Sequence, residues 1–365
     1  MPAAPKTMLF LSGLSTLFIV GAGSAILGLA VPAYEQQFQL STSTSGLLVS
    51  TVWIGCLTGV LTMYFKGAQI KPRPPLALLA IGSVLLAVAP AFWVALLGAL
   101  IFGIGYGVIA ALFNSRVLYA YGAQGASRIG MLNVLYSVGA IVAPYGFTIM
   151  GASLLPVFWT MAGLSALTWV FCGPVGLAGL PAPQAQGRGF RLHWPILALG
   201  LLSVGIEASL VGLGPSALNR AGLSAQRAAE LLSLFFVAAL AARIMLVLVA
   251  HRFADFAIFV FAIGWAALCG LGAAVIGPAL FFPLLGISAG LFFQGIYVTA
   301  TRKMGDDPRV SPVILALGQV GAILSPLFYT QFMDPLGSHG FFWLVAGVAA
   351  VAFVISALSY RAMMR

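Results

Sequence analysis

Charged residues are scarce in this chain. Only 7% of its 365 residues are Asp, Glu, Lys or Arg, while 61% are hydrophobic; soluble domains carry about a quarter charged residues. The acidic residues number 7 against 17 basic ones, and the basic residues stand singly between apolar stretches. Such spacing indicates membrane topology and argues against nucleic-acid binding. We therefore predict an all-α membrane protein without a soluble domain.

Reactive side chains are equally few. Cys56, Cys172 and Cys269 lie inside apolar stretches, where a thiol behaves as a small apolar group, and the three histidines fall between such stretches. A phosphate-binding Gly-rich loop ending in Lys-Ser or Lys-Thr is absent from the sequence. Asp306-Asp307 is the only acidic pair of the kind that an enzyme at the membrane face needs. We expect no enzyme, no catalytic residue, no metal and no cofactor.

Twelve apolar stretches are long enough to be membrane helices, each needing about 20 residues. The first is too long for a signal-peptide core, so we expect it to be an uncleaved span. The predicted spans are 8–34, 44–64, 75–92, 94–119, 127–150, 153–179, 194–217, 229–250, 256–276, 278–300, 310–333 and 340–360.

The basic residues predict the orientation of these spans. If the N-terminus is cytoplasmic, most of them fall in cytoplasmic connections, and only Arg220 and Arg227 fall outside. We expect a multi-pass protein of the cytoplasmic (inner) membrane with both termini in the cytoplasm.

The two halves of the sequence resemble each other. Ser137-Val-Gly-Ala-Ile-Val-Ala-Pro144 returns as Gln319-Val-Gly-Ala-Ile-Leu-Ser-Pro326. Val20-Gly21 returns as Val204-Gly205, and the glycines at 103 and 107 return at 286 and 290, all with offsets of 182 to 184 residues. We predict two six-helix pseudo-repeat bundles, residues 1–180 and 194–365, joined by a polar cytoplasmic linker at 181–193.

Such a duplicated arrangement resembles the major facilitator superfamily, in which two bundles rock around a central site. Four segments are similar to its fucose and proton symporter branch: Gly205-Ile-Glu207, Gly222-Leu-Ser224, Ala242-Arg243 and Arg252-Phe253. The drug-exporter pattern of several glycines before a proline in span 5 is missing, since only Gly139 precedes Pro144 there. The resemblance implies the major facilitator fold and a small-molecule substrate.

Glu207 is the one acidic residue deep in a predicted span. Ionisable groups in the membrane are costly and usually functional, so we interpret Glu207 as a proton-coupling carboxyl. The alternative is a neutral Glu bonded permanently to a neighbouring helix. Arg243 either reaches Glu207 through its long side chain or holds helix carbonyl groups in a structural or gating role. Arg116 either anchors its span at the interface by snorkelling or has a structural or gating role of its own.

Neutral polar and aromatic side chains inside the spans suit a neutral polar solute. The candidates for substrate binding are Asn114, Asn133, Tyr136, Phe293, Gln294 and Gln319, and the alternative for each amide is a contact between helices. Further aromatic rings suited to stacking are Trp53, Phe113, Phe292, Tyr297 and Phe328. Pro144 and Pro326 occupy equivalent positions and are predicted to bend their helices and close an outer gate.

Taken together, these features favour a secondary transporter that moves a small polar, sugar-like organic solute by alternating access, with proton coupling through Glu207. The alternative is an exporter of an amphipathic solute, a siderophore-like metabolite or a lipid. The expected partners are the substrate, protons and membrane lipid, with no nucleic acid and a monomeric chain.

Overall fold

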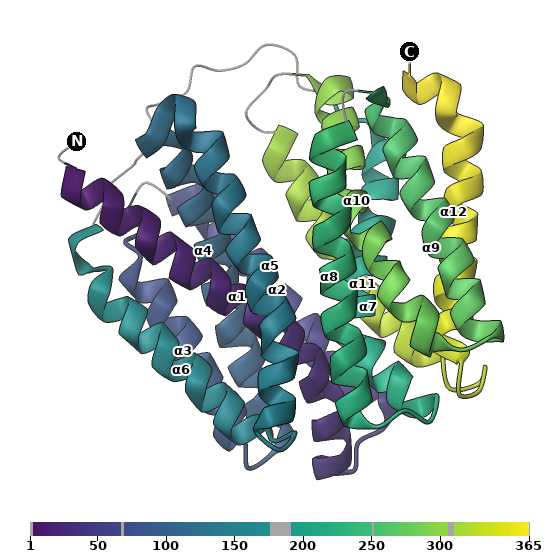
Figure 1. The fold of residues 1–365 in the computed structure, drawn as a ribbon, viewed down its shortest axis with the longest axis horizontal. Coiled ribbons are helices and arrows are strands. Elements are labelled where there is room, and N and C mark those ends of the chain that lie inside the picture. The colour runs from purple at the N-terminus through teal and green to yellow at the C-terminus, as the bar shows by residue number, and fades with distance from the viewer. Residues whose placement is uncertain (1–2, 67–68, 176–190, 250–251, 306–309, 365) are drawn as a thin grey trace. The chain divides into compact units, whose positions relative to one another are not determined.

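The computed structural model describes residues 3–66, 69–175, 191–249, 252–305 and 310–364. Within these ranges the regular elements are twelve α-helices and two short 3-10 helices (Figure 1). The α-helices are α1 (Ala3–Phe38), α2 (Thr42–Lys66), α3 (Arg73–Val88), α4 (Phe92–Tyr121), α5 (Gly125–Ile149), α6 (Leu154–Phe171), α7 (Trp194–Arg220), α8 (Ala225–Val249), α9 (Asp255–Val275), α10 (Pro278–Met304), α11 (Val310–Phe332) and α12 (Gly340–Met364).

The prediction of an all-α membrane protein with twelve helices is confirmed. Eleven of the described helices are long and apolar enough to cross a membrane. The exception, α3, has 16 residues and is therefore only about 24 Å long. The sixth span was predicted too long, because α6 ends at Phe171 and a short 3-10 turn at Gly173–Val175 follows. Pro174 explains this end, since helices usually stop before the residue preceding a proline.

The chain divides into two compact units. One comprises residues 1–40 and 47–184, and the other comprises residues 41–46 and 185–365. The start of α2 therefore belongs with the second unit, although the rest of that helix belongs with the first. The predicted linker at 181–193 lies mostly outside the described residues.

Helices pair in the same order within each unit. In the first unit α1 packs on α5 and α4, and α3 packs on α4 and α6. In the second unit α7 packs on α11 and α10, and α9 packs on α10 and α12. Each of these four pairings in the first unit therefore has a counterpart six helices later.

The repeated glycines of the sequence lie at these helix contacts. A Cβ atom added at Gly139 on α5 would lie 2.1 Å from the carbonyl oxygen of Phe18 on α1. At the corresponding position on α11, a Cβ atom at Gly321 would lie 2.0 Å from the carbonyl oxygen of Leu201 on α7. Only glycine permits such close backbone contact, and small residues serve this purpose at membrane helix interfaces.

The second matched pair of glycines also lies where two helix backbones come into close contact. A Cβ atom at Gly103 on α4 would lie 2.2 Å from the carbonyl oxygen of Val52 on α2. Its counterpart on α10, Gly286, would place a Cβ atom 2.0 Å from the carbonyl oxygen of Phe235 on α8. These glycines therefore serve close helix packing in both units.

Candidate functional site

Glu207 lies in the middle of α7. It is thirteen residues from Trp194 and thirteen from Arg220, which places it about 20 Å from each end of the helix. Its side chain is 28% exposed, and the neighbouring turns of α7 are lined by buried small residues such as Ser203 and Gly205. A carboxyl group therefore lies at the centre of a predominantly apolar helix.

Arg243 on α8 approaches this carboxyl group. Its guanidinium Nη2 lies 3.8 Å from Glu207 Oε1, within ion-pair distance but beyond hydrogen-bonding distance. The contact corresponds to the first of the two alternatives for Arg243, in which its long side chain reaches Glu207. Among the described residues Arg243 makes no hydrogen bond to a helix carbonyl group.

Three hydroxyl groups meet in the first unit and form what we call the hydroxyl cluster: Ser24 on α1, Tyr106 on α4 and Tyr136 on α5. The Tyr136 hydroxyl donates to Ser24 Oγ at 3.1 Å and lies 3.3 Å from the Tyr106 hydroxyl. Trp53 on α2 meets the Tyr106 ring edge to face, with centroids 5.9 Å apart. All four side chains are half-buried, so the cluster combines neutral hydrogen-bonding groups with an aromatic surface.

The structure separates the predicted amides into different environments. Asn114 on α4 and Gln319 on α11 each have a buried side-chain oxygen without a hydrogen-bond partner among the described residues. A buried acceptor without a partner is costly, and a bound solute or water would relieve that cost. Asn133 differs because it is exposed and donates to the carbonyl oxygen of Ile129 on its own helix. The side chain of Gln294 lies outside the described residues.

The predicted aromatic residues fall into a buried group and an exposed group. Phe113 and Phe292 are fully buried and pack in the interior of the protein. Phe293 is 38% exposed and stacks on Tyr297 with centroids 5.1 Å apart. Phe328 is exposed as well. Phe293 is therefore the more accessible of the two neighbouring phenylalanines of α10.

Arg116 is one of the largest fully buried side chains, with 1% of its surface exposed. Its guanidinium donates to the carbonyl oxygen of Ile70, which lies between α2 and α3. Snorkelling to the interface would leave the guanidinium exposed, so the structure favours the structural role of Arg116.

Pro144 and Pro326 lie inside α5 and α11, in the last third of each helix. Four residues later, the hydroxyl of Thr148 donates to the Pro144 carbonyl oxygen at 3.0 Å, and that of Thr330 donates to the Pro326 carbonyl oxygen at 2.8 Å. The two prolines therefore share this hydroxyl contact at their carbonyl oxygens. A bend and a gating role at these positions stay predictions.

We expect Pro144→Ala and Pro326→Ala each to slow transport roughly tenfold, which corresponds to about 1.4 kcal/mol on the rate-limiting step. Alanine restores the backbone hydrogen bond that proline lacks, and it should stiffen the helix. Initial transport rates and cysteine accessibility near the helix ends measure the effect. Pro156→Ala is the control, since Pro156 lies in the first turn of α6, where no such bond is missing. Unchanged rates in both variants would leave these prolines with a packing role alone.

No metal-binding group is evident in the described ranges, where no three His, Cys, Asp or Glu side chains gather. The three cysteines are buried and free.

The sequence matches no family model and no curated protein. Solved structures do resemble the chain. The nucleoside transporter NupG is 15% identical with a TM-score of 0.77, and the match covers 99% of this chain and 100% of that one. The chain has the fold of major facilitator superfamily transporters.

Two further transporters show the same likeness. The D-xylose-proton symporter is 12% identical with a TM-score of 0.76, covering 96% of this chain and 97% of that one. The E. coli fucose:proton symporter FucP is 16% identical with a TM-score of 0.64, covering 96% and 98%. The predicted resemblance to this superfamily is thus confirmed at the level of the fold, and all three structures are transporters rather than enzymes.

Proposed function

We propose that the chain is a secondary active transporter for a small, neutral organic solute that carries hydroxyl groups, such as a sugar or a nucleoside. The observation that carries this proposal is two sets of polar side chains within the hydrophobic helices: the hydroxyl cluster in one unit and Glu207 with Arg243 in the other. Both lie within strongly hydrophobic helices, where a polar group is costly to retain without a use. The fold shared with nucleoside and sugar transporters supports the same conclusion.

The chemistry of the hydroxyl cluster suggests the substrate class. Hydroxyl groups both donate and accept hydrogen bonds, so they match the hydroxyl groups of a sugar ring. The indole of Trp53 offers an aromatic face or edge for the less polar side of such a ring. Because Ser24, Tyr106 and Tyr136 carry no charge, the cluster does not select for an ionised solute.

Glu207 is the group that we propose to couple transport to protons. We also propose that the two units are pseudo-repeats that alternate in access, and that the chain acts as a monomer in the inner membrane with both termini cytoplasmic. The matched helix pairings and glycine contacts support the duplication. In the first unit, the Asn114 side-chain oxygen, which has no hydrogen-bond partner among the described residues, offers a further acceptor for the substrate. The substrate-binding roles of Gln319 and Phe293, which lie in the second unit, stay predictions.

Tyr136→Phe tests the substrate site. The variant removes the hydroxyl that joins Ser24 to Tyr106, and we expect the Kd for the substrate to rise about tenfold, as the loss of roughly 1.4 kcal/mol implies. D-xylose and uridine are suitable first probes, followed by a panel of sugars and nucleosides, with thermal shift of the purified protein and uptake into proteoliposomes as measurements. Tyr145→Phe, an exposed tyrosine on the same helix, is the matched control.

Two results would contradict this proposal in different ways. If no sugar or nucleoside of the panel is bound or transported, the substrate class is wrong. If one of them is transported and Tyr136→Phe binds it as tightly as the unaltered protein, the hydroxyl cluster is not its site.

A further inference from the structure

The start of α2 packs differently from the rest of that helix. Residues 41–46 belong with the second unit, whereas the helix from Leu47 onward belongs with the first. Thr42, Ser45 and Gly46 are buried, and their spacing places them on one face of the helix. A Cβ atom added at Gly46 would lie 2.5 Å from Thr330 Cγ2 on α11. The first turn of α2 is therefore in close contact with α11.

Arg220 joins the same turn to the ends of two helices of the second unit. It is the last residue of α7, and its guanidinium donates through Nη2 to the Thr42 hydroxyl and through Nη1 to the Asp334 carboxylate. Asp334 lies two residues beyond Phe332, the end of α11. We call Thr42, Arg220 and Asp334 the Arg220 network. The network ties the first turn of α2 to the ends of α7 and α11.

The remainder of α2 is fixed to the other unit. Cβ atoms added at Gly55 and Gly59 would lie 2.3 and 2.4 Å from backbone carbonyl oxygens of α4. Between these two attachments α2 is a single continuous α-helix, Thr42–Lys66. When the two units move relative to each other, as the proposed transport cycle requires, either α2 must bend or its first turn must leave α7 and α11.

The Arg220 network is suited to repeated release. The side chains of Arg220 and Asp334 are 28% and 50% exposed, and ion pairs at such positions contribute little to stability. Water can solvate both charged groups once they separate, whereas separation of a fully buried pair would leave uncompensated charges. The contact can therefore break and form again at small cost.

We propose that the Arg220 network is a conformational latch that stabilises the state in which the first turn of α2 packs on α7 and α11. With both termini cytoplasmic, as proposed above, α7 and α11 end at the outer face, so the latch is closed in the inward-facing state and open in the outward-facing state. This inference rests on the proposed alternating access and is independent of the substrate class. Removal of the network shifts the population toward the outward-facing state.

Cysteine labelling tests this proposal without any substrate. Ser45→Cys places a thiol on the buried face of α2, and lipid nanodiscs leave both membrane faces of the full chain open to an impermeant maleimide. We expect Arg220→Ala to speed the labelling of this thiol about fivefold, because the rate follows the population of the open state. Thr42→Val should act in the same direction and replaces Arg220→Ala if that variant does not fold.

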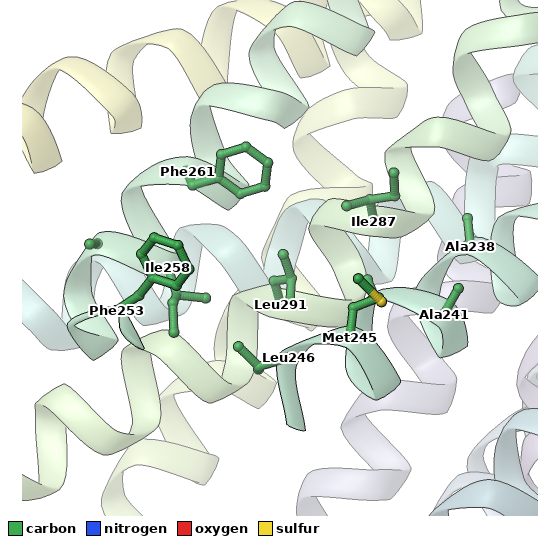
Figure 2. A pocket seen from close by; sticks show the side chains of 11 residues that line it. Ala238, Ala241, Met245, Leu246, Phe253, Ile258, Phe261, Ile287 and Leu291 are labelled. Atoms are coloured by element: carbon green, nitrogen blue, oxygen red, sulfur yellow. The ribbon is translucent and has the colours of Figure 1, made fainter. Parts of the chain in front are cut away.

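Two matched controls separate opening of the latch from general loosening. Arg227→Ala should leave the labelling of Ser45→Cys unchanged, since Arg227 lies at the same end of the unit but pairs with Glu230 on its own helix. Ala241→Cys is a control reporter in an apolar groove of about 650 Å³ between α8, α9 and α10, whose walls Figure 2 shows. The groove contains no residue of the Arg220 network, so labelling there should not depend on Arg220.

The outcomes distinguish the latch from the proposed function. Unchanged labelling of Ser45→Cys in a folded Arg220→Ala protein would overturn the latch, even if a sugar or nucleoside is transported. An equal increase in Arg227→Ala, or at Ala241→Cys, would also overturn it. Faster labelling confined to Ser45→Cys in the network variants would support the latch, and failure to transport the panel would then contradict only the proposed substrate class.

Discussion

Glu207→Gln is expected to abolish the pH-driven accumulation of substrate while counterflow of substrate across the membrane continues. Glutamine has the shape of a protonated glutamate but cannot bind or release a proton. Net proton-coupled transport needs that release, whereas exchange of one substrate molecule for another needs only binding and alternating access. Proteoliposomes with and without an imposed pH gradient measure the two activities separately.

The position of Glu207 explains why the effect should be large. Glu35 lies near the end of α1, Glu230 lies in the second turn of α8, and Asp255 begins α9, so each is close to a helix end. Glu207 is thirteen residues from either end of α7, and its described ionic partner is Arg243. No other carboxyl group in the described residues occupies a comparable depth.

Glu230→Gln is the matched control for this prediction. Glu230 is also on a membrane helix, but it pairs with Arg227 at 2.7 Å near the helix start. Accumulation should persist in that variant. If Glu207→Gln loses both accumulation and counterflow, Glu207 binds substrate or packs the helices instead. If the pH-driven accumulation is unchanged, Glu207 is not the coupling group and another residue carries the proton.

The fold was predictable because each helix is specified by a long, continuous stretch of its own sequence. Apolar stretches of about 20 residues give nearly all of the helices, and the repeated glycines at 103 and 286 mark close contacts that the structure shows. The end of α6 was missed because the apolar composition continues past the Gly173-Pro174 break. Composition sets the approximate length of a span, whereas backbone chemistry sets its end.

The site was less predictable, because its contacts join residues that are distant in the sequence. Ser24 and Tyr136 are 112 residues apart, and Tyr106 and Tyr136 are 30 apart. The position of Tyr106 beside Gly107, in a repeated segment, was the one available signal. Helices that are apolar all round carry little information about which face is inward. Asn133 shows the result: its residue type suited the site, yet its side chain is exposed and bonds to its own helix.

The other large effect is expected at Gly321, where α11 meets α7. In Gly321→Ala the new Cβ atom would lie 2.0 Å from the Leu201 carbonyl oxygen, so the two helices must separate. Overpacking typically costs about 1–3 kcal/mol, and contact with an immobile backbone atom should bring the loss to the upper end of that range. We expect a lower Tm and a smaller yield of monodisperse protein, measured by thermal melting and size-exclusion chromatography.

Gly347→Ala on α12 separates this steric effect from helix propensity. A Cβ atom there meets no other atom within 4 Å, and alanine favours a helix over glycine by about 1 kcal/mol, so this control should be neutral or more stable. Propensity alone would therefore raise the Tm of both variants, and only the contact with Leu201 lowers it at Gly321. Gly139→Ala, where the Cβ atom would lie 2.1 Å from the Phe18 carbonyl oxygen, should lose as much stability if the two halves are repeats. A stable Gly321→Ala protein would contradict the close contact of α7 with α11, and a loss at only one of the two positions would contradict their equivalence.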